Sequence, residues 1–329
     1  MLTLLWKQNL WSCSYTATRK EGFPMNNRDS GQANVNASVR SVSSLDDKSV
    51  SRLTKHMSVP AAFFALADPV VGQVTARAHQ LVSQGDAETL HKFRVALRQL
   101  RALWWAFAPL MDSAQAKLER DEFKRLAGVA GDTRDWDVLC ALLSSARQCS
   151  AIVENLAPAL AVQRELALSS TWATLKHADI ETHMRSVLLG TLRQLEEHGD
   201  EPVNKFAETR VRKAEKALRT SIKQAHRHKL PDFDALHEVR IAGKKLRYLL
   251  EFFAPLLAGH HDKNIKRLMT FQTQLGNLND VVVSEVKLRE TPLSGIGEND
   301  LTQTLNWMTK EKTRRLRAAQ RHIRRIKER

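Results

Sequence analysis

The sequence has few residues that interrupt helices, with 13 glycines and 9 prolines among 329 residues. It also has no alternating run rich in Val, Ile or Thr, the pattern that indicates β-strands. Apolar residues recur instead with the 3.6-residue period of an amphipathic helix. The chain is therefore predicted to be all-α.

Cysteines and long apolar runs are also scarce. The three cysteines, Cys13, Cys140 and Cys149, form no Cys-x-x-Cys pair. This spacing excludes a disulfide framework or a zinc ribbon and fits a reducing compartment. No apolar run approaches the length that a membrane span requires. We therefore expect a cytoplasmic protein that has no membrane partner.

The sequence lacks the motifs of the common enzyme classes. It has no P-loop, no nucleophile elbow, no His-Glu-x-x-His and no carboxylate cluster suited to magnesium. A phosphoryl-transfer enzyme needs carboxylates that hold metal ions beside its cations. The sequence therefore predicts a binding module without catalytic residues, cofactor or metal site.

Positive charge is abundant but unevenly distributed. The formal net charge is +15, of which the first 59 residues carry +4 and the last 20 carry +8. The remaining body carries only +3. A site for a polyanion in that body must therefore come from the spatial segregation of charge and not from bulk basicity.

An internal repeat is the strongest pattern in the chain. Residues 90–110 read LHKFRVALRQLRALWWAFAPL, and residues 236–256 read LHEVRIAGKKLRYLLEFFAPL. The two segments are identical at 11 of the 21 positions. A repeat of this strength indicates one structural unit used twice.

Each copy of the repeat places its cations on one face of a helix. At 100° per residue, the basic residues of the first copy fill a stripe about 80° wide, opposite the apolar residues. Exposed faces usually mix both signs of charge, whereas these stripes are only cationic, which favours a polyanion-binding surface. The two stripes consist of His91, Arg94, Arg98 and Arg101 in the first copy and His237, Arg240, Lys244 and Arg247 in the second.

Two further basic segments leave alternatives open. Arg212, Lys216 and Arg219 share one face of a predicted helix, where they either contact a ligand or pair with the nearby glutamates. The run at residues 314–329 reads RRLRAAQRHIRRIKER. It is either a frayed, solvated helix end that complements the helix dipole, or an additional contact for an anion or RNA.

The predicted organisation is a disordered extension at residues 1–57, followed by an ordered domain at residues 58–329. The domain divides into halves at about residues 58–199 and 200–329, with the boundary at Gly199–Pro202. Asp86 is predicted to cap the first repeated helix, and Pro109 and Pro255 to end the two repeated helices. Further helices are expected at residues 113–130, 134–148, 150–175, 180–198, 203–228, 262–276, 278–290 and 298–327.

The repeated H-x-x-R-x-x-x-[RK]-x-x-R helix resembles the CHAD family, the conserved histidine α-helical domain. The segments GDTRDWDV at residues 131–138 and LGNLNDV at residues 275–281 are similar to two further motifs of that family. The resemblance covers roughly residues 60–329. No strand-rich stretch with alternating Glu and Lys is present, so the chain resembles the stand-alone form of the family.

The resemblance implies a fold and a ligand. The fold would be two antiparallel four-helix bundles related by a pseudo-twofold axis, with a shared basic groove or pore. The ligand would be inorganic polyphosphate, possessing one charge on each phosphate and no bases. Arginine suits phosphate because its planar fork donates paired hydrogen bonds, whereas lysine acts as a point charge. The predicted ligands are His91, Arg94, Arg98, Arg101, Arg212, Lys216, Arg219, His237, Arg240, Lys244, Lys245 and Arg247.

Other residues of these motifs receive more ordinary interpretations. The two histidines have three possible roles: they bind phosphate, they are hydrogen-bonded structural residues, or they act as a metal ligand or a phosphoacceptor. Arg94, three residues after His91, disfavours the metal interpretation because it would repel a cation. Arg134 and Asp135 are predicted at a helix start, and a ligand role for Arg134 is the alternative. The aromatic residues of the repeat are predicted to be core, namely Trp104, Trp105, Phe107, Phe252 and Phe253.

Two other functions remain open at this stage. The same stripes and the basic C-terminal run could bind RNA or DNA, although no nucleic-acid motif and no surface aromatic set is present. Alternatively, the chain could be a regulatory scaffold that polyphosphate targets to granules. The sequence indicates no protein partner and no oligomeric state.

Overall fold

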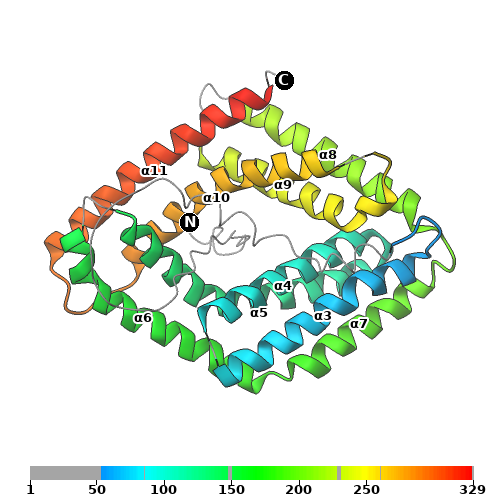
Figure 1. The fold of residues 1–329 in the computed structure, drawn as a ribbon, viewed down its shortest axis with the longest axis horizontal. Helices are drawn as coiled ribbons and strands as arrows, with labels where there is room; N and C mark the ends of the chain where they lie inside the picture. Colours follow the sequence, from blue (N-terminus) through cyan, green and yellow to red (C-terminus); the bar gives the residue numbers. More distant parts are fainter. Residues whose placement is uncertain (1–52, 85, 147–149, 228–230, 260, 328–329) are drawn as a thin grey trace, which may run out of the picture.

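The computed structural model describes residues 53–84, 86–146, 150–227, 231–259 and 261–327 (Figure 1). Within these residues the only β-type pairing is a single bridge between Ser58 and Pro202, so the predicted all-α class is confirmed. The described helices are α3 (Val59–Gln84), α4 (Ala87–Phe107), α5 (Ser113–Ser144), α6 (Ser150–His177), α7 (Ile180–Glu196), α8 (Val203–Arg227), α9 (Phe233–Phe253), α10 (Asp262–Glu290) and α11 (Glu298–Lys327).

The two copies of the repeat form α4 and α9, and they begin and end alike. Asp86 caps α4 by accepting a hydrogen bond of 2.7 Å from the Thr89 amide, and Asp232 caps α9 in the same way. Each helix runs into a short 3₁₀ turn of sequence Ala-Pro-Leu. Proline has no amide hydrogen to continue the α-helical ladder, so the predicted helix ends at Pro109 and Pro255 are confirmed.

Two predicted helix breaks are wrong. The helices expected at 113–130 and 134–148 form one helix, α5, which ends at Ser144, and those expected at 262–276 and 278–290 form one helix, α10. Both helices continue through a glycine, Gly131 and Gly276, because a glycine inside a helix costs only about 1 kcal/mol relative to alanine, and packing can offset that cost. Arg134 and Asp135 therefore lie in the middle of α5 and not at a helix start.

The helices of the two halves contact one another in the same order. In the first half α3 packs on α4, α4 on α5 and α5 on α6, while α7 packs on α3. In the second half α8 packs on α9, α9 on α10 and α10 on α11. The halves meet where α4 contacts α9 and α5 contacts α10, which places these four helices inside and the others around them (Figure 1).

The starts of the two halves also pair with each other. Val59 at the start of α3 donates its amide hydrogen to the Glu201 carbonyl, and Val203 at the start of α8 donates to the Met57 carbonyl. Of the predicted extension at residues 1–57, residues 1–52 lie outside the described residues. Leu53, which is described, is buried in the main hydrophobic core.

Aromatic residues of the repeat fill the core between the halves. Trp104, Phe107, Phe252 and Phe253 are buried, and Trp104 packs edge-to-face against Phe63 of α3 with 4.9 Å between the ring centroids. Burying each of these side chains contributes about 1.5–3 kcal/mol. Their predicted core role is confirmed, whereas Trp105 is only partly buried.

One helix of the described residues, α3, is long and apolar enough at Val59–Ser83 to cross a membrane by length and composition alone. The prediction that no apolar run approaches this length is therefore wrong for α3. The helix packs against α4 and α7, and its large apolar side chains Phe63 and Leu66 are fully buried. Core helices of soluble proteins have this same composition, so length and hydropathy do not distinguish the two environments.

Candidate functional site

The basic residues of the first repeat are buried against α5. His91, Arg94 and Arg98 are each less than 9% exposed on α4. Arg94 donates a hydrogen bond of 3.1 Å from Nη1 to the Ala127 carbonyl of α5. A Cβ atom on Gly131, one turn further along α5, would lie only 2.6 Å from that Nη1. The glycine thus lets the guanidinium lie directly on the helix backbone.

The middle of α5 faces this stripe with charges of its own. Arg134 is buried, and its positive charge acts on both His91 and Arg94. Burial raises the pKa of Asp135, while Arg94 and Lys287 oppose that increase. The segment at residues 131–138 therefore supplies an additional cation and a partly compensating carboxylate beside the first stripe.

The second copy is buried more deeply and has a similar neighbour on α10. Arg240 is 1% exposed and Lys244 is not exposed at all. Burial raises the pKa of Asp280 on α10 to about 6, against the opposing effect of Arg240, Arg134 and Arg315. The segment at residues 275–281 thus presents a carboxylate to the cations of α9 from the middle of α10.

Contacts between α4 and α9 bring the two stripes together. Arg98 of α4 donates from Nε to the Tyr248 hydroxyl of α9 over 3.0 Å. Arg247 donates to Gln272 of α10 over 2.9 Å and to Glu251 over 2.6 Å. Asp280 lies close enough to Arg134 and Arg240 for both to act on its pKa. Cations from both halves therefore form one cluster, which we call the central cluster: His91, Arg94, Arg98, Arg134, His237, Arg240, Lys244 and Arg247.

The two histidines of the central cluster are neutral near pH 7. Burial, together with the charges of Arg98, Arg134, Arg94 and Lys92, lowers the pKa of His91 to about 3. Burial, Arg240 and Lys244 lower the pKa of His237 to about 4. The surrounding positive charge disfavours a metal ion at either ring, and no three metal-ligating side chains cluster within the described residues.

One ring nitrogen of His91 does not fit the interpretation of this residue as a hydrogen-bonded structural histidine. Its Nδ1 is buried and has no hydrogen-bond partner among the described residues. A buried polar atom of this kind is uncommon in folded proteins and calls for an explanation such as a ligand or an ordered water.

Lys245 lies in a different environment, beside Trp105, and Arg120 of α5 acts on both Lys245 and Arg101. Lys245 lies 5.3 Å from the centroid of the Trp105 ring, and Arg210 of α8 lies 4.5 Å from it. Burial lowers the pKa of Arg101 to about 10, with Asp121 opposing that decrease and Arg120 adding to it. Arg120 and Arg210 also act on Lys245, so these cations form a second, smaller group.

The third predicted stripe is not brought to the central cluster. Arg212, Lys216 and Arg219 are exposed on α8, on the face opposite the residues that pack on α9. Arg219 also pairs with Glu215 over 3.2 Å. The structure therefore separates these three residues from the cations of α4 and α9.

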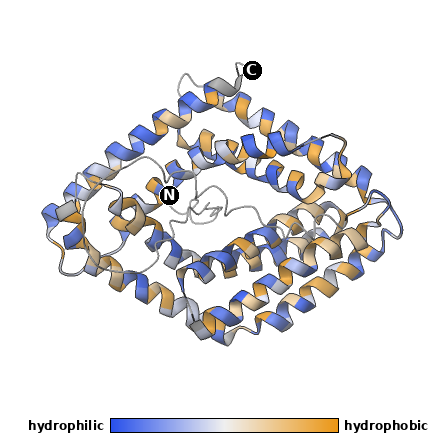
Figure 2. Cartoon of the chain, viewed as in Figure 1, coloured by the Kyte–Doolittle hydropathy of each residue, from blue (hydrophilic) through white to orange (hydrophobic). Residues whose placement is uncertain are grey.

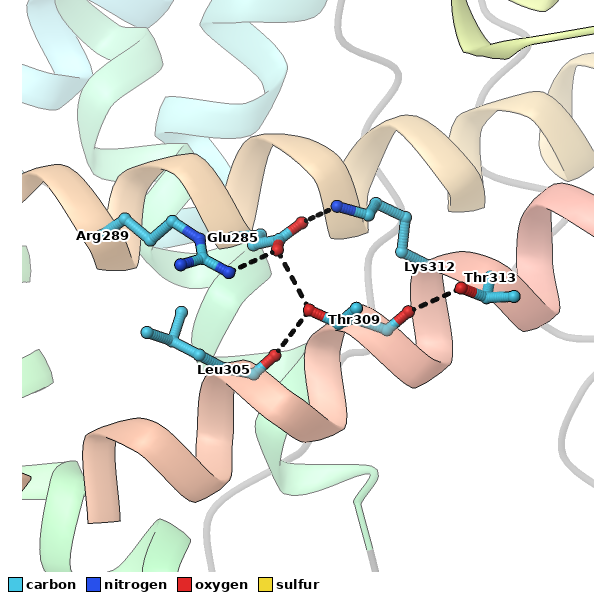
Figure 3. A network of polar contacts seen from close by, with 6 residues as sticks. All are labelled: Glu285, Arg289, Leu305, Thr309, Lys312 and Thr313. Carbon is cyan, nitrogen blue, oxygen red and sulfur yellow. Dashed lines mark hydrogen bonds and ion pairs between the residues drawn. The ribbon is translucent and has the colours of Figure 1, made fainter. Parts of the chain in front are cut away.

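The basic C-terminal run is a docked helix as far as it is described. Figure 3 shows buried Glu285 of α10 contacting Arg289, Thr309 and Lys312, which ties α11 to α10. Further along, Arg315 donates to the Asn277 carbonyl over 2.7 Å, and Ile323 is buried. The interpretation of this run as a frayed end is therefore wrong for residues 314–324.

The predicted ligand set omitted several members of the site, although a ligand role for Arg134 had been kept as an alternative. Arg134, Asp135 and Asp280 lie inside the two motif segments that had been interpreted as helix starts. Tyr248 has no equivalent in the first copy, where Ala102 stands. Arg315 lies in the C-terminal run, and only the packing of α11 on α10 brings it near Asp280.

Comparisons with known proteins agree with this fold. The family model described as CHAD domain matches residues 65–289. The crystal structure of the CHAD domain from the plant Ricinus communis superposes with a TM-score of 0.68 at 24% identity, covering 83% of this chain and 93% of that one. PptA from Streptomyces chartreusis superposes with a TM-score of 0.54 at 15% identity, covering 80% of this chain and 99% of that one. No curated protein matches the chain.

Proposed function

This chain belongs to the CHAD domain family, and we propose that it binds inorganic polyphosphate through the central cluster. The observation that carries the proposal is that cations from both copies of the repeat meet. Arg98 donates to the Tyr248 hydroxyl and Arg247 lies over the Tyr248 ring. Arg134 and Arg240 both act on Asp280. One linear polyanion could therefore contact both halves at once.

The chemistry of the central cluster suits a phosphate chain. Polyphosphate has charge and spacing but no bases, so a protein can recognise it only as it recognises a nucleic-acid backbone. Arginine forks hold phosphate oxygens with paired hydrogen bonds. Burial also lowers the local dielectric constant, which strengthens each of these attractions. A bound anion would offset the burial and mutual repulsion that lower the pKa of Arg94 to about 10.

The proposed ligand set differs from the predicted one. His91, Arg94, Arg98, His237, Arg240, Lys244 and Arg247 remain in it, and Arg134 is added. Arg101 and Lys245 would contact a chain only as it extends toward Trp105, and the exposed residues of α8 would not contact the same segment.

We further propose that the two halves are four-helix bundles related by a pseudo-twofold axis, with a basic groove or pore between them. Helices α3 to α6 and α8 to α11 have the same order of neighbours, which supports this arrangement. Helix α7 would be an addition to the first bundle, because it packs on α3 and has no counterpart in the second half.

The proposal is one of binding and not of catalysis. Asp135 and Asp280 lie beside Arg94 and Arg240, where each partly compensates a buried cation. Carboxylates committed in this way are poor candidates for holding the magnesium that phosphoryl transfer requires. Binding would place the protein on polyphosphate granules in the cytoplasm.

Paired substitutions test the proposal. The Arg94→Gln/Arg98→Gln and Arg240→Gln/Lys244→Gln variants should each bind polyphosphate about tenfold or more weakly, and each lost contact should reduce the log–log salt slope by on the order of one unit. The matched control is Lys117→Gln/Arg185→Gln, which removes the same charge from exposed positions of the first half. Titration calorimetry gives the affinities, and circular dichroism checks folding.

Equal losses in the control and in the paired variants would show that net charge alone drives binding, and the proposal would fail. Should the glutamine variants unfold, Arg94→Lys/Arg98→Lys keeps the charge and removes only the planar fork. A loss of affinity in that folded variant would support phosphate contact. Competition at equal phosphate concentration distinguishes the nucleic-acid alternative, since polyphosphate should displace RNA and DNA.

A further inference from the structure

The outer helices of the two halves differ strongly in charge, although they occupy matching places in the chain. Helices α3 and α6 each have a formal net charge of zero. Helices α8 and α11, which follow the same order in the second half, each have a formal net charge of +6. This asymmetry is not a consequence of the repeat, and it lies outside the central cluster.

The charge on α8 and α11 faces away from the core. The cations of α8 lie opposite Val211 and Ala214, and those of α11 lie opposite Met308 and Ala319, all of which are buried. Figure 2 shows α11 as hydrophilic along most of its length. The exposed residues, which we call the outer stripes, are Lys205, Arg212, Lys216, Arg219 and Lys223 on α8 and Lys310, Arg314, Arg317 and Arg321 on α11.

The two helices that bear the outer stripes approach each other at one corner of the molecule. Ala225 near the end of α8 shares a hydrophobic cluster with Ala319 and Ile323 of α11. Figure 1 shows α8 and α11 as two edges of the fold that meet near the C-terminus. A surface hollow of about 480 Å³ lies along α11 at Thr313, Arg317 and Arg321. The hollow is lined by α11 alone, so only a wide ligand at this corner could reach cations of both helices.

Carboxylates neutralise only a small part of the outer stripes. Arg219 pairs with Glu215, and Arg314 pairs with Glu311. No ion pair involves the other seven cations of the outer stripes within the part of the chain that the structure describes. Surface charge of one sign on this scale raises the local concentration of anions and attracts polyanionic partners.

We propose that the outer stripes bind the phosphate backbone of double-stranded nucleic acid, independently of the polyphosphate site. The buried central cluster suits a thin, flexible polyphosphate chain. The exposed cations on two rigid helices can instead contact a wide, rigid duplex. The α8 stripe spans about 27 Å from Lys205 to Lys223, at 1.5 Å per residue. Duplex DNA presents one charge per about 1.7 Å of its axis, so several phosphates lie within reach.

The composition of the stripes favours a duplex over a single strand. Single-stranded binding sites rely on aromatic side chains on which bases stack, and none of the exposed residues described on α8 and α11 is aromatic. Contacts to the backbone alone carry no sequence information. The predicted binding is therefore independent of sequence and strongly dependent on salt.

A four-residue variant tests the outer stripes, namely Lys216→Gln, Lys223→Gln, Arg317→Gln and Arg321→Gln together. Its matched control replaces Lys117, Lys176, Arg185 and Arg193, which are exposed in the first half and carry the same total charge. With a short duplex DNA of mixed sequence as the probe, the stripe variant should bind about tenfold or more weakly and lose about 0.9 in salt slope per contact. The control should stay within about twofold of the wild type.

Polyphosphate titrated separately gives the second readout, and its affinity should be unchanged in the stripe variant. The inference is overturned if the control loses as much duplex binding as the stripe variant, or if single-stranded DNA binds as tightly as the duplex. It is also overturned if the stripe variant loses polyphosphate affinity in parallel, because the outer stripes would then belong to the polyphosphate site. Failure of the proposed polyphosphate function appears instead in the central variants.

Discussion

Helices α4 and α9 are two copies of one sequence, yet they place equivalent cations in different surroundings. Arg101 of α4 is partly exposed, whereas its counterpart Arg247 of α9 is 3% exposed and pairs with Glu251 over 2.6 Å. The position equivalent to Glu251 is Trp105 in the first copy. One substitution four residues further along the helix thus replaces the carboxylate that pairs with the arginine of the second copy by an indole ring in the first.

The same difference gives each copy a separate role in the fold. In the second copy, Arg247 and Glu251 hold α9 to α10 through Gln272. In the first copy, Trp105 accepts Lys245 and Arg210 on its ring and thereby connects α4 to α9 and α8. A repeated motif therefore fixes which residues are cationic, while the residues around it decide which helices each copy holds together.

The largest loss of stability is expected when Arg247, the ion-paired arginine of the second copy, is replaced. Arg247→Met should destabilise the protein by about 3–5 kcal/mol, because it leaves Glu251 buried without its partner. Arg101→Met, the equivalent change in α4, should cost less, because the residue four positions further on is Trp105, which has no charge that the substitution would leave buried. Urea unfolding of both variants measures the difference.

A double variant separates the ion pair from simple packing. Arg247→Met with Glu251→Gln removes both charges, so it should recover most of the stability that the single Arg247→Met variant loses. If the double variant is as unstable as the single one, the methionine disturbs packing, and the contrast between the copies does not depend on the ion pair.

A smaller effect is expected from the two histidines as the pH falls. The folded-state pKa values, about 3 for His91 and about 4 for His237, lie below the ordinary value of 6.5. Between each folded-state pKa and 6.5, the unfolded chain therefore binds more protons than the folded protein does. The stability that the neutral histidines provide is complete above pH 6.5 and is lost as the pH falls toward 4 and 3. The melting temperature should fall accordingly between pH 7 and pH 5.

Substitution of each histidine tests the difference between the copies. His91→Gln should flatten this acid-side loss more than His237→Gln, because four cations act on His91 and two act on His237. Asp280 contributes with the opposite sign, since its folded pKa of about 6 is raised and its stabilising effect is lost as the pH rises. Identical pH profiles for both histidine variants and the wild type would contradict the prediction.

The smallest effect concerns the glycine beneath Arg94. Gly131→Ala should displace the Arg94 guanidinium from the Ala127 carbonyl and weaken polyphosphate binding a few-fold, with little change in stability because a flexible side chain can move. Gly128→Ala, one turn earlier on α5, meets open space. It should stabilise the helix by up to about 1 kcal/mol and leave binding unchanged. Equal affinities in the two variants would show that Arg94 need not lie on α5.

The sequence by itself determined the parts of this protein that depend on neighbours three or four residues apart. These include the helical class, the cap at Asp86, the helix ends at Pro109 and Pro255, and the aromatic core. They also include the cationic face of each repeated helix, because helical periodicity alone places those residues on one side.

Only the tertiary structure decided which charged faces meet. It joined Arg134 and Asp280 to the stripes of α4 and α9, continued α5 through Gly131, and turned the cations of α8 outward. None of this follows from local periodicity, because the partners lie far apart in the chain, and their contacts depend on how whole helices pack. Burial then sets the electrostatics, since removing a charge from water costs free energy that only residues or ligands brought there by the fold can offset.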